Sequence, residues 1–223
     1  MESIYIYISA IKALLGVKQS TPNKICLIEA GMPPLKVLVL QKQSTFINKI
    51  INERSDLEDD PLIFALNLTE KLNPKMRKCI NDLKYRLNCP DVNIVKRYVA
   101  NATTTRYTTY ANINSDMSMH NVYARRYDRN SFIPEVYRIA FTRMRTSSHR
   151  LRIETGRWSR LGREDRICKC GMGVGDEFHA MMQCPLTEDL RKSYGPVFFP
   201  ELLANASTFK DFKYIHDVLE LCE

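Results

Sequence analysis

The chain has 223 residues, of which 44% are hydrophobic and 26% are charged. This composition can bury a substantial core, which excludes an intrinsically disordered protein, and the length suffices for one large domain or two small ones. Only eight residues are glycine, which argues against a glycine-rich β-sandwich and favours helices. The net charge of +8 is confined to one part of the chain, described below.

Residues 1–98 carry sequence signals of helices. Apolar residues recur at helical spacing before a glycine suited to a C-terminal cap: Ile4, Ile8, Ile11, Leu15 and Gly16. The alternating Ile and Tyr at 4–8 also fit a strand. Prolines indicate further helix starts at Thr21-Pro22, Pro33-Pro34, Asp60-Pro61 and Pro74. Asp59-Asp60 precedes a proline and an apolar helix, so we interpret it as a cap and not as a polymerase metal site. We expect a helical bundle.

Residues 99–121 are rich in Thr, Asn and Ser and are predicted to form a linker or loop. After it, Pro134 is expected to start a helix, and 207–222 should form an amphipathic helix behind a Ser-Thr cap, with Phe209, Phe212, Ile215 and Leu219 on its apolar face. The predicted fold is mainly α: a helical bundle, then a basic helical region at 122–223 with a small zinc-binding module at about 142–190.

Three of the seven cysteines lie between residues 168 and 184. The apolar start of the chain lacks the basic residues and cleavage site of a secretory signal, and it is too short and too charged for a membrane span. We therefore expect an intracellular, reducing compartment and no membrane partner, and clustered cysteines there bind metal more often than they form disulfides. The remaining cysteines are interpreted as ordinary core or surface residues: Cys26, Cys79, Cys89 and Cys222.

Four potential metal ligands follow the pattern C-x-C-x8-H-x4-C: Cys168, Cys170, His179 and Cys184. Three thiolates and one imidazole fill every position of a tetrahedral structural zinc site, so we predict a structural Zn²⁺ and no catalytic role for it. Three glycines between Cys170 and His179 allow the chain to turn back. The alternative is a chance pair of cysteines beside an unrelated helix with a buried His and Cys.

The spacing of the last two ligands restricts the end of their helix. His179 and Cys184 would be separated by about 500° of an α-helix, so they converge only if the helix stops as it reaches Cys184. Pro185 supplies that stop. Asp176-Glu177 is expected to open the same helix, at its positive end.

The basic charge lies between His120 and Cys170, where 13 Lys and Arg residues face 5 Asp and Glu residues. Twelve of the 13 cations are arginines, whose planar forks suit phosphates and base edges. A localised basic segment is typical of a nucleic-acid binder, and the alternative is a solvated basic face on an ordinary domain. The candidate contacts are Arg143, Arg145, His149, Arg150, Arg152, Arg157, Trp158, Arg160, Arg163 and Arg166.

Other side chains in 142–166 fit the same interpretation. The hydroxyls of Thr146, Ser147 and Ser148 suit phosphate oxygens. Trp158, the only tryptophan, can stack on a base, and its alternative role is a core anchor beside the zinc site. Single arginines can instead form helix-surface ion pairs.

The sequence resembles the C-terminal zinc region of non-LTR (LINE-type) retrotransposon reverse transcriptases. The resemblance is strongest over 142–185, in the runs R-L-R-I-E-T-G-R-W-S-R, R-E-D-R-I-C-K-C-G and D-E-F-H-A-M-M-Q-C-P. The N-terminal half is similar to the helical stretch after the polymerase palm, in L-L-G-V-K-Q-S-T-P-N, E-A-G-M-P-P-L and D-D-P-L-I-F-A-L. The similarity implies a region that grips template RNA and target DNA in target-primed reverse transcription, with zinc on the four ligands above.

Catalysis is not expected from this chain, and no small-molecule substrate is expected. It has no Y-x-D-D palm motif, and Pro90-Asp91 lacks the downstream acid-x-Lys of a restriction-like nuclease. The leading hypothesis is a non-catalytic fragment of the polyprotein that binds RNA, DNA or both. The alternatives are a zinc-stapled protein-interaction module and a decayed retroelement remnant.

Overall fold

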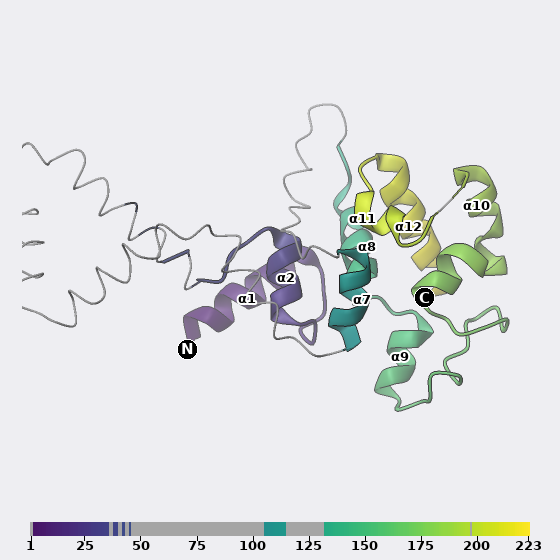
Figure 1. Cartoon of the computed structure of the whole chain (residues 1–223), viewed down its shortest axis with the longest axis horizontal. Coiled ribbons are helices and arrows are strands. Elements are labelled where there is room, and N and C mark those ends of the chain that lie inside the picture. The colour runs from purple at the N-terminus through teal and green to yellow at the C-terminus, as the bar shows by residue number, and fades with distance from the viewer. Residues whose placement is uncertain are drawn as a thin grey trace, which may run out of the picture. The chain divides into compact units, whose positions relative to one another are not determined.

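The computed structural model describes residues 2–35, 38–39, 42, 45, 105–114, 132–196 and 198–223 (Figure 1). The chain divides into two compact units, Met1–Met32 with Ala102–Glu223, and Pro33–Asn101. The first unit joins the two ends of the sequence, which differs from the predicted domain boundary at residue 98. The helices expected after Asp60-Pro61 and Pro74 lie outside the described residues, as do Cys79 and Cys89.

Two N-terminal helices form a hairpin with its own apolar cluster. Helix α1 spans Glu2–Leu15 and helix α2 spans Asn23–Ala30, so the helix prediction for the first segment is confirmed and the strand alternative is wrong. The buried cluster comprises Ile8, Ile11, Leu15, Val17, Cys26, Leu27 and Ala30. Gly16 ends α1 with a φ of 64°, a conformation that glycine adopts at no steric cost.

The start of α2 differs in detail from the expected cap. Pro22 is the N-cap residue, and no side chain caps this end. The hydroxyl of Thr21 instead donates a hydrogen bond to Ser148 Oγ at 3.2 Å, and Thr21 is buried. The Thr21 side chain, which the local sequence predicted as the cap of α2, therefore forms a tertiary hydrogen bond instead.

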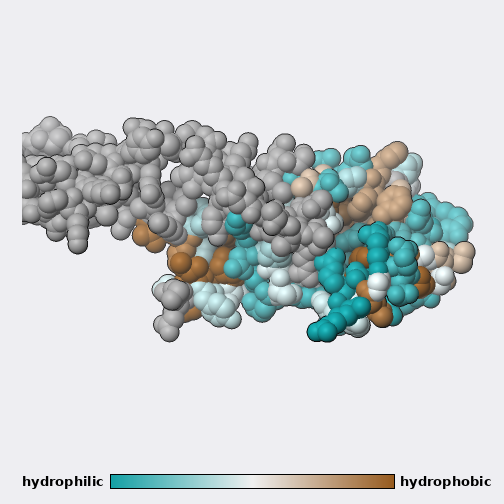
Figure 2. All heavy atoms as spheres, turned by 60° about the horizontal axis from the view of Figure 1, so that its bottom comes forward, coloured by the Kyte–Doolittle hydropathy of each residue, from teal (hydrophilic) through white to brown (hydrophobic). Residues whose placement is uncertain are grey.

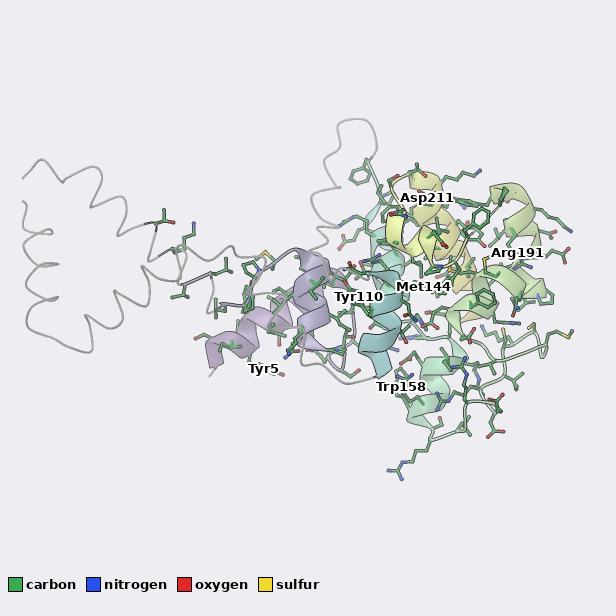
Figure 3. All side chains as sticks on the ribbon, viewed as in Figure 1. Tyr5, Tyr110, Met144, Trp158, Arg191 and Asp211 are labelled. Carbon is green, nitrogen blue, oxygen red and sulfur yellow. The ribbon has the colours of Figure 1, made fainter. Side chains whose placement is uncertain are left out.

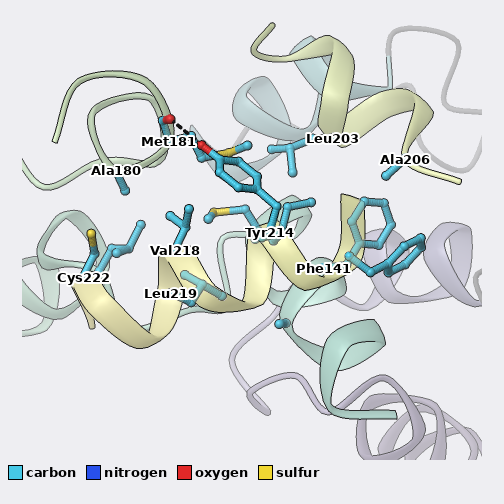
Figure 4. Packing of buried hydrophobic residues seen from close by; sticks show 14 of the residues in the cluster. Phe141, Ala180, Met181, Leu203, Ala206, Tyr214, Val218, Leu219 and Cys222 are labelled. Atoms are coloured by element: carbon cyan, nitrogen blue, oxygen red, sulfur yellow. Dashed lines mark hydrogen bonds between the residues drawn. The ribbon is translucent and has the colours of Figure 1, made fainter. Parts of the chain in front are cut away.

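The main core of this unit forms between α8, Glu135–Arg145, and α12, Phe209–Cys222. Phe141 and Phe212 meet with ring centroids 4.6 Å apart, and both are fully buried (Figure 4). Tyr214 donates its buried hydroxyl to the carbonyl of Met181 at 2.8 Å, which attaches α12 to the segment that carries His179. The core is therefore attached directly to the segment that carries the predicted zinc ligand His179.

The predicted C-terminal helix is confirmed, including its cap. Thr208 and Asp211 form a reciprocal capping box at the start of α12. Three of the four residues expected on its apolar face are buried, whereas Phe209 is 42% exposed. Pro134 precedes α8 as its N-cap residue, one position before the helix proper.

The other elements are short: α7 at Thr105–Ile113, α9 at Arg152–Trp158, a π-helical turn at His179–Gln183, a 3-10 turn at Pro185–Thr187, α10 at Glu188–Tyr194 and α11 at Glu201–Asn205. Helix α7 corrects the prediction of a linker or loop over 99–121 for Thr105–Ile113, and it buries Tyr110 and Ile113, whereas the rest of that range, apart from Asn114, lies outside the described residues. The described residues are mainly α, with one isolated antiparallel bridge between Ile167 and Val174. Within these residues, no helix is long and apolar enough to cross a bilayer.

Candidate metal centre and basic surface

The four predicted ligands come together in space. The ligand atoms of Cys168, Cys170, His179 and Cys184 all lie within 4.8 Å of one another. The Sγ atoms of Cys168 and Cys184 are 3.8 Å apart, and Cys170 Sγ lies 3.2 Å from His179 Nε2. In a tetrahedral zinc site the expected separations are about 3.8 Å between two sulfurs and about 3.6 Å between sulfur and nitrogen. The cluster can therefore hold a metal ion, and its size suits zinc.

The first two ligands lie in a tight loop. The backbone N–H of Cys168 donates to the carbonyl of Gly173 at 2.8 Å, and that of Gly171 donates to the carbonyl of Cys168 at 2.9 Å. Gly171 has a φ of 74°, and an ideal Cβ there would meet no atom, so backbone conformation is the reason for glycine at this position. The loop closes at the bridge between Ile167 and Val174.

The last two ligands lie on one turn with a capped start. Asp176 Oδ1 accepts a hydrogen bond from the backbone N–H of His179 at 2.9 Å, as expected of a residue that opens the helix. The N–H of Cys184 donates to the carbonyl of His179 at 2.7 Å, five residues back, which makes this a π-type turn. The wider turn reduces the angular mismatch that five residues of α-helix would create. Cys184 itself is extended, and Pro185 follows it.

Three of the four ligands are buried, and burial affects the ionisation of their thiols. Cys168, His179 and Cys184 are buried, and Cys170 is half-buried. Burial raises the pKa of the Cys168 thiol to about 11, so at neutral pH that sulfur stays protonated until a cation stabilises the thiolate. For Cys170, burial acts to raise the pKa, but hydrogen bonds from the Met172 N–H and the neighbouring thiols outweigh it and the pKa is lowered. Three sulfurs and one ring nitrogen form a donor set typical of structural zinc, with no position left for a substrate.

A fifth thiol lies beside the cluster. Cys222 is buried at the end of α12, with its Sγ 3.9 Å from that of Cys184. Burial raises its pKa strongly, and the neighbouring Cys184 sulfur adds to the effect. Cys222 does not belong to the set of four whose ligand atoms are mutually close. Its sequence position gave no sign of this proximity, because the fold alone brings the end of α12 to Cys184.

Backbone hydrogen bonds attach α9 to the loop of residues 167–175 that carries Cys168 and Cys170, called the metal loop below. The N–H of Ile153 donates to the carbonyl of Gly175 at 3.0 Å, and the N–H of Gly175 donates to the carbonyl of Arg166 at 2.9 Å. A Cβ on Gly175 would lie 3.1 Å from the Cα of Cys168, a tight contact that would force the backbone or a neighbour to shift. The conformation of the loop that carries Cys168 and Cys170 therefore affects the position of α9.

Arg166 completes this attachment. Its guanidinium donates to the carbonyls of Ile153 at 3.1 Å and Leu161 at 2.7 Å. Arg166 is half-buried and its donors face the protein, which removes it from the predicted nucleic-acid contacts. It serves instead to join α9, the following turn and the metal loop.

Arg145 is also removed from the predicted contacts. It is 1% exposed, and its guanidinium forms an ion pair with the buried carboxylate of Glu29 at 2.8 Å. Tyr110 donates its hydroxyl to the same carboxylate at 2.6 Å. Burial alone would lower the pKa of Arg145, but the charge and hydrogen bonds of Glu29 outweigh it and the pKa is raised. Arg145 thus connects α8 to α2 inside the protein.

His149 is buried as well, and its Nε2 lies 2.9 Å from Glu177 Oε1. Burial acts to raise the pKa of Glu177, but the hydrogen bond and charge of His149 outweigh it and the pKa falls to about 2. Ser147 donates its hydroxyl to the same carboxylate at 3.1 Å. This corrects the prediction for His149, and for the hydroxyls of 146–148, which are buried and form hydrogen bonds within the chain.

The remaining predicted contacts lie at the surface. Arg143, Arg150, Arg152, Arg160 and Arg163 are exposed, and Arg157 is half-buried. Arg157 pairs with Glu154 of the same helix at 3.2 Å, as the helix-surface alternative expected, and Arg163, outside a helix, pairs with Asp176 at 2.9 Å. Within the described ranges, the structure gives no acidic partner to the side chains of Arg150, Arg152 and Arg160. In Figure 2 the part of the molecule that carries α9 presents a mainly hydrophilic surface.

Trp158 is 52% exposed at the end of α9 (Figure 3), so the core-anchor alternative is wrong. The ammonium of Lys18 lies over its ring, 3.9 Å from the centroid. The sequence did not point to Lys18, since it belongs to the distant turn between α1 and α2.

Comparisons of the chain with protein-family models, with curated proteins and with solved structures found no match. The geometry of the cluster and of the basic surface therefore supplies the basis for a function.

Proposed function

We propose that this protein is a zinc-stapled module that binds RNA or DNA and performs no catalysis itself. The proposal rests on the attachment of a basic surface, formed by the exposed Arg150, Arg152 and Arg160, to a four-ligand metal centre. Ile153, the second residue of α9, hydrogen-bonds to Gly175, which lies between ligands Cys170 and His179. A metal on the four ligands fixes this loop and so fixes the exposed arginines beside it.

The charges support a polyanionic partner. The side chains of Arg150, Arg152 and Arg160 are exposed and have no acidic partner among the residues that the structure describes, although the backbone N–H of Arg150 donates to Glu223 Oε1 at 2.6 Å. Such cations release condensed counterions when they bind phosphates, which supplies much of the free energy of non-specific nucleic-acid binding. Zinc in this module contributes to folding and supplies no open position for chemistry.

The resemblance to LINE-type reverse transcriptases supplies a biological setting for the proposal. In that setting the chain is a C-terminal piece of the polyprotein, and it holds template RNA or target DNA during target-primed reverse transcription. The runs that carry the resemblance include all four ligands and the exposed arginines of α9.

The test is the salt dependence of binding by the zinc-loaded chain. A labelled single-stranded RNA, a single-stranded DNA and a duplex are titrated between about 50 and 200 mM salt. Contacts with about five phosphates predict a loss of affinity of about 100-fold for the single strands and about 500-fold for the duplex over this range. Affinity that stays flat, or no binding to any of the three, would contradict the proposal.

Two lysines on α10 and α12 offer a matched control. Lys192 and Lys213 are exposed cations that already pair with Glu188 and Asp217. Their replacement by glutamine should leave the salt dependence unchanged, whereas replacement of Arg150 and Arg152 should reduce it.

A further inference from the structure

The contact between Lys18 and Trp158 joins two parts of the chain that are far apart in sequence. Lys18 lies in the turn between α1 and α2, and Trp158 ends α9. The Lys18 ammonium is 3.9 Å from the centroid of the indole ring, which is cation–π distance. Trp158 is nevertheless 52% exposed, so about half of the residue's surface remains open to solvent.

The turn that carries Lys18 is firmly attached to the arginine-rich segment. The backbone N–H of Lys18 donates to Ser148 Oγ at 2.8 Å, and its ammonium donates to the carbonyl of His149 at 2.6 Å. Arg143 donates from Nε to the carbonyl of Gly16 at 2.7 Å while remaining exposed. The ammonium and the ring are therefore positioned before any ligand arrives.

An exposed indole beside a cation suits the binding of nucleic-acid bases. Proteins that bind single strands combine basic residues along the backbone path with aromatic rings on which bases stack. The Lys18 ammonium lies over the Trp158 ring, and the half-buried Arg157 and the exposed Arg160 are close to Trp158 in the sequence. In a duplex the bases are already stacked on one another, so an indole at the protein surface can stack only on an unpaired or end base.

We propose that Trp158 and Lys18 form a base-stacking site selective for single-stranded nucleic acid. This inference rests on the proposed function and deepens it by naming the class of substrate and by adding the N-terminal turn to the interface. An unpaired base stacks on the exposed surface of Trp158. Lys18 holds the ring in place and neutralises a phosphate next to that base.

Intrinsic fluorescence tests the site directly, because Trp158 is the only tryptophan in the chain. The zinc-loaded full chain is titrated with an unstructured oligouridylate and with a duplex of equal length, and binding is measured in parallel by anisotropy of labelled oligonucleotide. The single strand is expected to quench the fluorescence and to bind more tightly than the duplex. Quenching by the duplex equal to that by the single strand would overturn the proposal.

Variants separate stacking from charge. Trp158→Leu should lower affinity for the single strand by about 5- to 150-fold, while Trp158→Phe should recover part of it. Lys18→Met should lower affinity and reduce the salt slope by about one, while Lys192→Met on α10 should do neither. Zinc content equal to that of the unaltered chain confirms that each variant is folded around the metal centre.

The outcomes distinguish this inference from the function on which it rests. If the oligouridylate binds with strong salt dependence but Trp158→Leu binds as tightly as the unaltered chain, the stacking site is refuted and the basic surface stands. If neither oligonucleotide binds, both proposals fail.

Discussion

Two neighbouring stretches of the arginine-rich segment differ in the burial of their side chains. In residues 142–149 all side chains but that of Arg143 are buried, and Arg145 and His149 pair with Glu29 and Glu177. In residues 150–169 most basic side chains are exposed. Both stretches look alike in sequence, since each mixes arginine with small polar residues. A count of basic residues in the sequence therefore overstates the positive charge available at the surface, because some of these residues are already paired with carboxylates inside the fold.

The physical reason is the position of each stretch relative to the core. Residues 142–145 end α8 and residues 146–149 follow it, and nearly all of them are buried, where an unpaired charge would be costly. Residues 150–169 contribute Leu151, Ile153 and Cys168 to the core, while most of their basic side chains stay at the surface. The first stretch therefore contributes to stability and the second is available to a partner.

The largest expected effect comes from loss of the metal. Cys168→Ser should abolish stoichiometric zinc and loosen residues 150–187, because structural zinc in small modules contributes about 10–16 kcal/mol to folding. Hydrogen exchange should show lost protection there and retained protection in α1 and α2. The control is Cys222→Ser, which removes the adjacent thiol and should keep one zinc per chain. Zinc lost equally from both variants would assign Cys222 a ligand role.

The buried stretch should respond to charge removal through stability. Arg145→Met leaves the Glu29 carboxylate buried without its cation, which should cost about 3–5 kcal/mol in the free energy of unfolding. Arg152→Met, at an exposed arginine, should change it by about 0.5 kcal/mol or less. Urea unfolding of both variants measures the difference. Equal costs would mean that the two stretches do not differ as described.

The exposed stretch should respond through binding. Replacement of Arg150, Arg152 and Arg160 together by glutamine should reduce the slope of log affinity against log salt by about 2–3, since each phosphate contact contributes about 0.7–0.9. The unfolding free energy should stay within about 1 kcal/mol of the original, because these side chains are at the surface. An unchanged slope would place the nucleic-acid contacts elsewhere.

A smaller effect should follow from the attachment between the metal loop and α9. Gly175→Ala brings a methyl group to 3.0 Å from Arg152 Cβ and 3.1 Å from the backbone of Cys168. The strain should cost about 1–3 kcal/mol and weaken both zinc retention and nucleic-acid affinity. Gly171→Ala has no such contact, so it reports the backbone strain of a positive φ alone. Zinc competition with a chelator compares the two variants.

Local signals in the sequence predicted much of the fold and most of the metal cluster. The helix at Glu2–Leu15, the capping box at Thr208 and the close approach of four ligands all depend on residues near one another in the chain. Helix α7 was missed because its threonines and asparagine resemble a loop, and burial of Tyr110 against α2 is a tertiary effect. The pairing of Arg145 with Glu29 was also missed, because it too is a tertiary contact between residues far apart in the sequence.

The most direct test of the link between metal and partner is a comparison of oligonucleotide affinity with and without zinc. The zinc-loaded and chelator-treated chains are titrated with the same single-stranded RNA at fixed ionic strength. If zinc holds the exposed arginines in place, the metal-free chain should bind at least about tenfold more weakly, although its positive side chains are unchanged. Equal affinity of the two forms would contradict a zinc-stapled binding surface.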